Sequence, residues 1–215
     1  MNRKLLIAIP CYETMRVEFA ESLMQLLSVL NREKVWYEVK FLTGSLVYAA
    51  RDHLAKHAVN NEFTHVLWID SDMVFPGTII DDLEISGERD MVCGMFISRH
   101  YPYVNCIFSS LDPVDRIDKV TETDAFRIAG CGFGCVLMKT EVLKAVMINN
   151  SGKCFIPEPK LGEDCAFCMR ATAAGYEIWC EPTARVGHIG AVEIWPEDGG
   201  RLRGEIQGLE GKQLK

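Results

Sequence analysis

The sequence lacks a long apolar run, and it has no excess of basic residues. No stretch approaches the roughly 18 apolar residues that a membrane-spanning helix needs, so we expect no transmembrane segment. Lysine and arginine number 23 against 30 aspartates and glutamates, which gives a net charge of -7. This balance argues against a nucleic-acid or membrane-surface binder, because both need a basic face. An anionic ligand would therefore have to be recruited by local cations.

The chain also lacks a signal-peptide pattern, since "MNRKLLIAIP" leads directly into an apolar, strand-like run. It has nine cysteines, an odd number that does not favour a disulfide framework. We expect reduced thiols and a cytoplasmic location. A zinc site built from Cys131, Cys135, Cys165 and Cys168 is one alternative. However, Cys165 and Cys168 fall inside a predicted helix, which favours buried free thiols.

A glycine-rich phosphate-binding loop is missing as well. The "GCGFG" of residues 130–134 does not match GxGxxG, and no Walker lysine follows it. Its glycines either let the backbone approach a sugar or acceptor, or form a turn before a strand, and both readings stay open. Internal repeats and a convincing linker are missing too. We therefore expect a single domain over residues 1–195, and a flexible tail over 196–215, where glycine and charge dominate.

Hydrophobic residues make up 48% of the chain, and their arrangement predicts a doubly wound α/β domain. Buried-strand runs in "KLLIAIP", "YEVKFL" and "THVLWI" alternate with helical patterns over 17–33 and 45–61. A short helix follows, with Thr78 and Asp81 as a weak capping box. After it we expect a strand in "DMVCGMFI" and short antiparallel strands within 104–128. A later helix begins at Glu163 and ends near Gly175, and the next strand ends at Pro182.

Two aspartates, Asp70 and Asp72, stand at the exit of the third buried strand, in "HVLWIDSDMVFP". Ligands of open α/β sheets bind outside the carboxyl ends of the strands. Carboxylates at that position suit Mg²⁺ or Mn²⁺, which bridge to phosphate oxygens. A polar strand exit, with Asp72 bound to nearby backbone N–H groups, explains the pattern equally simply. Asp-x-Asp alone is a weak motif.

A second acidic pair, Glu163 and Asp164, opens the later helix. The helix dipole favours acids there, but a carboxylate at that position also suits a general base. The two side chains point about 100° apart on a helix, so only one is expected to face a substrate squarely. His188, between glycines in "VGHIG", is a candidate third metal ligand, although a lone histidine is usually structural.

Taken together, three segments resemble glycosyltransferases of the GT-A fold, close to the family 2 type. They are "HVLWIDSDMVFPGTIIDDL", "GCGFGCVLMKTEVL" and "GEDCAFCMRATAAGYEIWCEPTARVGHIG", and the likeness runs in order over about residues 4–190. It implies a Rossmann-like, three-layer α/β fold with a central, mostly parallel sheet and a smaller antiparallel portion. It also implies that Asp70 and Asp72 hold Mn²⁺ or Mg²⁺ and a nucleotide sugar, that His188 can complete the metal site, and that Asp164 is the base, with Glu163 beside it.

The same resemblance suggests contacts to the donor. Pro10, Tyr12 and Glu13 follow the first strand, where the family places the base and ribose of the nucleotide. Ser71 and Gly132 lie within the matching segments and join the expected nucleotide-sugar contacts. Tyr12 could equally be a packed aromatic residue.

Two arginines complete the set of expected contacts to the nucleotide sugar. "AARDHLA" resembles a family segment in which an arginine contacts the nucleotide, which points to Arg51; this chain has Asp52 where asparagine is common. Arg51 can bind phosphate in a bidentate manner, or Asp52 can hold it in place. Arg99, with His100 beside it, follows a strand end and is either a donor contact or a surface residue.

We therefore expect a metal-dependent enzyme that moves a sugar from a nucleoside-diphosphate sugar to an unidentified acceptor hydroxyl, with inversion implied by the resemblance alone. A sugar-phosphate nucleotidyltransferase is a weaker alternative, because "IAIPCYE" carries no glycine-rich basic loop. A third alternative is a non-catalytic scaffold that binds a nucleotide or glycan. The sequence does not identify the sugar, the nucleotide, the acceptor or the oligomeric state.

Overall fold

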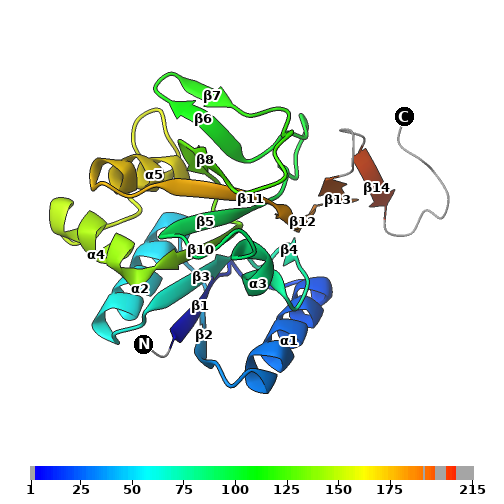
Figure 1. Cartoon of the computed structure of the whole chain (residues 1–215), viewed down its shortest axis with the longest axis horizontal. Helices are drawn as coiled ribbons and strands as arrows, with labels where there is room; N and C mark the ends of the chain where they lie inside the picture. Colours follow the sequence, from blue (N-terminus) through cyan, green and yellow to red (C-terminus); the bar gives the residue numbers. More distant parts are fainter. Residues whose placement is uncertain (1–2, 191, 197–201, 207–215) are drawn as a thin grey trace.

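The computed structural model describes residues 3–190, 192–196 and 202–206 of the chain (Figure 1). A seven-stranded sheet in the order β2-β1-β3-β10-β5-β11-β8 forms the centre. Strands β2, β1, β3, β5 and β11 run in one direction, and β10 and β8 run in the other. The strands span Lys4–Pro10 (β1), Trp36–Leu42 (β2), His65–Ile69 (β3), Met91–Met95 (β5), Phe126–Ile128 (β8), Cys135–Lys139 (β10) and Ile178–Arg185 (β11).

Helices cover both faces of this sheet, and each face has its own hydrophobic core. Helices α2, α4 and α5 pack on one face, around Trp68 and Phe133. Helices α1 and α3 pack on the other, where Phe19, Leu23 and Leu26 form the buried stripe of α1. The helices span Val17–Arg32 (α1), Val47–Asn60 (α2), Ile79–Leu83 (α3), Thr140–Asn149 (α4) and Glu163–Ala173 (α5). The three-layer α/β fold, with a mostly parallel central sheet and a smaller antiparallel portion, is confirmed.

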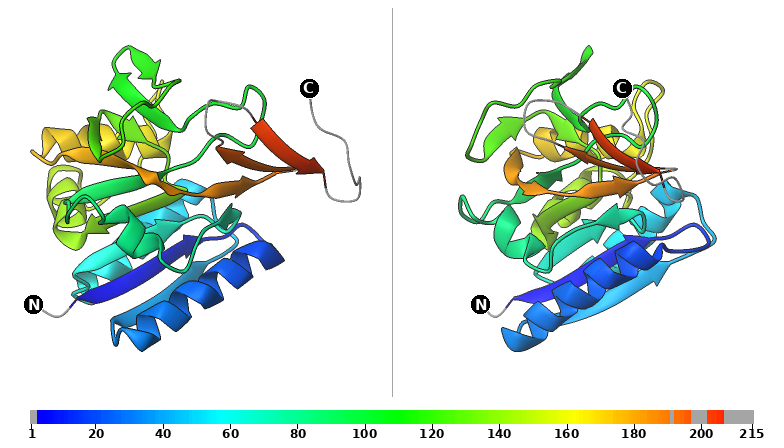
Figure 2. Two further views of the ribbon diagram at one scale, coloured as in Figure 1. Left: turned by 45° about the vertical axis from the view of Figure 1, so that its right-hand side comes forward. Right: turned by 90° about the vertical axis from the view of Figure 1, so that its right-hand side faces the viewer.

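Two small antiparallel sheets complete the described chain. One has the order β7-β6-β9, and the other has the order β14-β13-β12-β4, of which β13 and β14 project from the body of the molecule (Figure 2). The strands span Met73–Val74 (β4), Ile107–Leu111 (β6), Val114–Arg116 (β7), Gly130–Cys131 (β9), Gly187–Ile189 (β12), Val192–Pro196 (β13) and Leu202–Ile206 (β14). Strand β14 falls within the expected tail, whereas residues 197–201 and 207–215 lie outside the described residues.

Several local predictions need correction. Helix α4 was not expected, because it follows β10 with no loop between them. Strand β11 continues past Pro182 to Arg185. Thr78 does precede α3, but its side chain makes no capping bond and instead donates to Asp82 Oδ2 at 3.1 Å. Gly175, with φ +93°, follows Ala174, the C-cap residue of α5, and so occupies the expected C′ position.

No helix within residues 3–190, 192–196 and 202–206 is both long and apolar enough to cross a membrane.

Candidate active site

Arg51 links the two acidic pairs that the sequence places far apart. It lies on α2 with only 3% of its side chain exposed. Its Nη2 donates to both carboxylate oxygens of Asp70, at 3.0 and 3.1 Å. Its Nη1 donates to Glu163 Oε1 at 2.8 Å and to Asp164 Oδ1. One buried guanidinium therefore holds three carboxylates from two further segments of the chain.

The exit of β3 forms a turn, and the side chain of Asp70 points away from it. The backbone forms the turn, because Met73 N–H donates to the Asp70 carbonyl at 3.2 Å. The side chain of Asp70 does not serve that turn and points to Arg51 instead. Since 30% of this side chain is exposed, the carboxylate lies at the surface of the site.

The acidic pair at the start of α5 converges on a single nitrogen. Glu163 and Asp164 both accept from Arg51 Nη1, in spite of the rotation between neighbouring helix positions. Asp164 also accepts, through Oδ2, a hydrogen bond from Phe133 N–H at 3.2 Å. The helix dipole and two donors thus orient Asp164, while 27% of its side chain stays exposed to solvent.

Asp72 belongs to a second, neighbouring group of charges. Its Oδ2 accepts from Arg99 Nη1 and lies 3.5 Å from His188 Nε2. The other ring nitrogen of His188 is 2.9 Å from the carbonyl oxygen of Ile97, which fixes the orientation of the ring. Strand β4 begins directly after Asp72 and pairs with β12. This pairing brings His188, which lies on β12, to the exit of β3. Arg99 is 46% exposed and can leave Asp72 without opening the core.

The surroundings shift the pKa values of these acids in opposite directions. Burial raises the pKa of Asp164 to about 7; Arg51 opposes this shift, and the nearby Glu163 and Asp70 add to it. Burial also raises the pKa of Asp70. Burial alone would raise the pKa of Asp72, but His188 and Arg99 outweigh it and lower that pKa. In return, Asp72 raises the pKa of His188 against the effect of burial.

The carboxylate of Asp72 and the imidazole of His188 are ligands that suit a divalent cation. No cluster of three or more histidine, cysteine or acidic side chains suited to a metal ion occurs in the part of the chain that the structure describes. Asp70 is turned to Arg51, so the expected three-ligand set is not assembled. Mg²⁺ and Mn²⁺ in nucleotide enzymes commonly use one or two protein ligands plus phosphate oxygens and water. Asp72 offers a carboxylate and His188 an imidazole for a site of this kind.

The four cysteines considered for zinc are free thiols. Cys131, Cys135 and Cys168 are buried in the two cores, and burial raises the pKa of Cys135 to about 12. Cys168 donates to the Cys131 carbonyl at 3.8 Å. These surroundings are typical of buried, unreactive thiols.

The remaining residues expected to contact the nucleotide sugar are less closely connected to Arg51 and Asp72. Pro10 ends β1 in the core, whereas Tyr12 is 71% exposed in the loop that follows. Glu13 is exposed beside it, and Ser71 is half-buried between the two aspartates. Gly132 serves packing, because a Cβ there would lie 3.0 Å from the Phe96 ring. Asp52 does not hold Arg51 but accepts, at 2.7 and 2.8 Å, from the N–H groups of Cys154 and Phe155.

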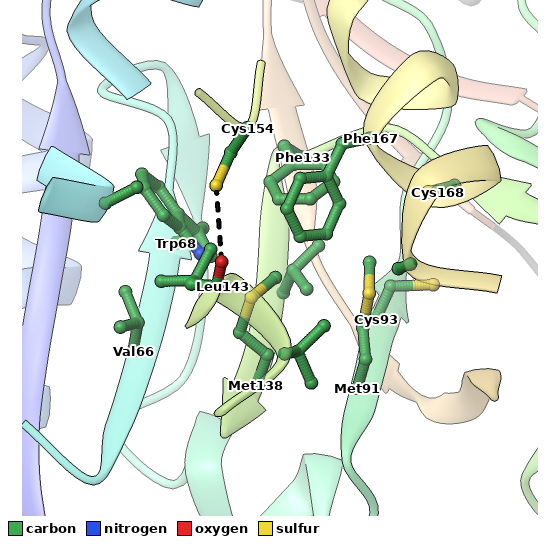
Figure 3. Packing of buried hydrophobic residues seen from close by; sticks show 14 of the residues in the cluster. Val66, Trp68, Met91, Cys93, Phe133, Met138, Leu143, Cys154, Phe167 and Cys168 are labelled. Carbon is green, nitrogen blue, oxygen red and sulfur yellow. Dashed lines mark hydrogen bonds between the residues drawn. The ribbon is translucent and has the colours of Figure 1, made fainter. Parts of the chain in front are cut away.

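Sequence reasoning missed the aromatic support of the site. The Phe133 ring lies 5.4 Å from the Arg51 guanidinium carbon, so one residue supports both Arg51 and Asp164. Phe133 packs against Trp68 and Phe167, and Figure 3 shows these three side chains in the hydrophobic core. The only available signal was the position of Phe133 between two glycines, which also suits a turn.

A cavity of about 600 Å³ is lined by residues of α1, β4 and β11. Ser22, Phe75 and Thr183 are among its lining residues, and none of the expected site residues lines it. The acidic groups therefore line a separate surface at the carboxyl ends of the parallel strands.

No family model matches the sequence, and no curated protein matches it. Among solved structures, the chain is similar to A197 from STIV, with 16% identity, 99% of this chain and 98% of that chain covered, and a TM-score of 0.59. It is less similar to a UDP-glucose pyrophosphorylase solved with UDP-glucose (9% identity, 85% and 90% covered, TM-score 0.49). A mutant of the Drosophila β1,4-galactosyltransferase 7, solved with manganese, UDP-Gal and xylobiose, matches with 14% identity, 83% and 65% covered, and a TM-score of 0.45. The likeness to A197 shows that the two chains share a fold.

Proposed function

We propose that this protein is a metal-dependent glycosyltransferase that moves a sugar from a nucleoside-diphosphate sugar to an acceptor hydroxyl. The observation that carries the proposal is the meeting of Asp70, Glu163 and Asp164 around Arg51. Asp72, Arg99 and His188 form the group beside it. Apart from Arg99, which was a candidate because it follows a strand end, these are residues that the resemblance assigns to donor binding and catalysis.

The donor diphosphate would lie at the exit of β3. Asp72 and His188 would hold Mn²⁺ or Mg²⁺ there, with Asp70 close by. When bound, the ion neutralises the negative charge that grows on the leaving diphosphate. Arg99 is exposed enough to exchange Asp72 for a phosphate oxygen of the donor. Tyr12, Glu13, Pro10, Ser71 and Gly132 remain our candidates for contacts to the base, ribose and sugar.

Asp164 would act as the base. The acceptor oxygen attacks the anomeric carbon, its proton passes to Asp164, and the bond from that carbon to the diphosphate oxygen breaks. A base works best when its pKa lies near the working pH, and burial moves the pKa of Asp164 in that direction. Attack opposite the leaving group inverts the anomeric carbon, as the resemblance implies.

Arg51 has a different role in this proposal from the one that the resemblance implied. The hydrogen bonds of its two Nη nitrogens go to Glu163, Asp164 and Asp70, and its side chain is 3% exposed. It would hold Asp164, Glu163 and Asp70 in place and would reach a phosphate only after releasing one of them.

The proposal is tested first by a thermal-shift screen of UDP-, GDP-, CMP- and dTDP-sugars, with and without Mn²⁺. A donor that binds the native state raises the melting midpoint by mass action. The best donor is then incubated with candidate acceptors, and the products are identified by mass spectrometry. A nucleoside diphosphate and a glycoside support the proposal. Release of pyrophosphate from a sugar phosphate and a nucleoside triphosphate would instead make the protein a nucleotidyltransferase. Binding without turnover would make it a scaffold.

A further inference from the structure

Strand β2 is the last strand of the central sheet, so one of its edges is unpaired among the residues that the structure describes. It runs from Trp36 to Leu42 and pairs with β1 in an unbroken parallel register. The Leu42 carbonyl accepts from Cys11 N–H at 2.9 Å, so the backbone polar groups of Leu42 face β1. These groups alternate in direction along a strand. The N–H and C=O groups of Tyr37, Val39 and Phe41 therefore point away from the sheet.

The side chains of β2 give this edge a self-complementary pattern. Glu38 and Lys40 lie on one face, with Oε1 and Nζ 3.9 Å apart. Tyr37 lies on the opposite face, where its hydroxyl is 3.2 Å from Asn31 Oδ1 of α1. Two large apolar side chains of the strand are exposed to solvent, at 52% and 39%: Trp36 and Phe41.

We propose that β2 pairs with β2 of a second copy of this chain, antiparallel about a two-fold axis at Val39. In this register Val39 faces the partner's Val39, and Tyr37 faces the partner's Phe41. These are the residues whose N–H and C=O groups point outward, so each pair exchanges two hydrogen bonds. The two central sheets then form one continuous sheet across the dimer.

The charges select this register over its neighbours. With the axis at Val39, Glu38 lies opposite the partner's Lys40, and Lys40 lies opposite the partner's Glu38. Opposite charges facing each other across an antiparallel pair are favourable, and like charges are unfavourable. Moving the axis by one residue in either direction would set Glu38 against the partner's Glu38, or Lys40 against the partner's Lys40. A lysine commonly protects an edge strand from pairing, but here Glu38 supplies its complement on an identical edge.

Helix α1 adds a second contact to the same interface. It runs alongside β1 and β2 in both views of Figure 2, so a two-fold axis at β2 brings the helix near its own copy. Met24 lies seven residues before Asn31 and therefore on the same face of α1, the face directed to β2. Its side chain is 63% exposed, which leaves an apolar group available to the partner helix.

The test uses the full chain and a charge swap. We expect the unmodified protein to have the mass of two chains by light scattering at micromolar concentration. Lys40→Glu and Glu38→Lys each replace both attractive pairs by repulsive ones, and each should raise the dimer dissociation constant at least about tenfold. The double variant Glu38→Lys with Lys40→Glu restores opposite charges and should restore the dimer. Thermal melting of each variant confirms that it is folded.

Val39→Pro provides an independent arm. The Val39 N–H points outward, so proline there removes a donor needed by the dimer and none used by the β1–β2 pairing. A folded, monomeric Val39→Pro variant supports the proposal. An unmodified protein that is monomeric at several hundred micromolar would overturn it. Single charge variants that remain dimeric, or a folded double variant that remains monomeric, would equally overturn it.

Discussion

Both carboxylate oxygens of Asp70 accept hydrogen bonds from the same nitrogen of Arg51, at 3.0 and 3.1 Å. The other terminal nitrogen of Arg51 is bound by Glu163 and Asp164. The exit of β3 and the start of α5 are therefore coupled through one side chain. Because of this coupling, single substitutions can test the contribution of each charged group.

Arg51→Ala should destabilise the folded protein, because three carboxylates lose their shared cation. We expect the free energy of unfolding in urea to fall by about 2–3 kcal/mol. The value stays modest because 19–30% of each acidic side chain is exposed to water. Arg99→Gln is the matched control: it breaks an exposed pair with Asp72 and should cost about 0–1 kcal/mol. Equal losses in the two variants would contradict the central role of Arg51.

Asp72→Asn should remove most of the Mn²⁺-dependent affinity for a nucleoside diphosphate while leaving the fold intact. The amide keeps the shape of the side chain but loses the charge that a hard cation requires. Calorimetric titrations with and without Mn²⁺ measure the effect. Asp81→Asn, on the exposed side of α3, is the control and should bind normally. An unmodified protein that binds nucleotide equally well without metal would rule out the site.

Asp164→Asn should bind the sugar nucleotide nearly normally but transfer the sugar at least about a hundredfold more slowly, because the base is lost. Turnover with a working acceptor and donor affinity by calorimetry are measured together. If Asp164→Asn turns over normally and Glu163→Gln is inactive, the roles of the two acids are reversed. If neither change slows transfer, the mechanism proposed for Asp164 is wrong.

The raised pKa of Asp164 also predicts how stability depends on pH. Burial lifts this pKa from its ordinary value of 3.8 to about 7, so the folded protein holds the proton more tightly than the unfolded chain does. The contribution of Asp164 to stability should therefore fall as pH rises from about 4 to about 7. Asp164→Asn should remove that part of the pH dependence in metal-free buffer. A stability difference between the two proteins that does not change over this range would contradict the shift.

His188 should titrate above its ordinary pKa in the metal-free protein, because Asp72 stabilises the imidazolium against the opposing effect of burial. The stabilising contribution of this pair is therefore complete below about pH 6.5 and is lost as pH rises through the raised pKa. Titration of the ring protons by NMR measures this pKa directly. In Asp72→Asn, the pKa of His188 should fall below that of the unmodified protein; an unchanged value would mean that Asp72 does not act on it.

The sequence alone determined most of the elements and the positions of the acids along them. After their first residues, the runs "KLLIAIP" and "HVLWI" are apolar throughout, a pattern typical of strands that are covered on both faces. Asp70 and Asp164 could be placed at the exit of a strand and the start of a helix, because the periodicity changes at those positions. Helix α4 escaped notice because it begins directly after the last residue of β10, with no loop between them and no side-chain cap.

Only the tertiary structure decided which groups meet. Arg51 is 112 and 113 positions from Glu163 and Asp164 in the chain, and no local pattern specifies a contact over that separation. The pairing of β12 with β4 brings His188 to Asp72, and the order of the strands leaves β2 at the edge. Local periodicity fixes whether a segment is a strand or a helix, since each residue responds to its neighbours in the chain. The partners of a buried charge depend instead on how the sheet is assembled, because the bonds that satisfy that charge come from distant segments.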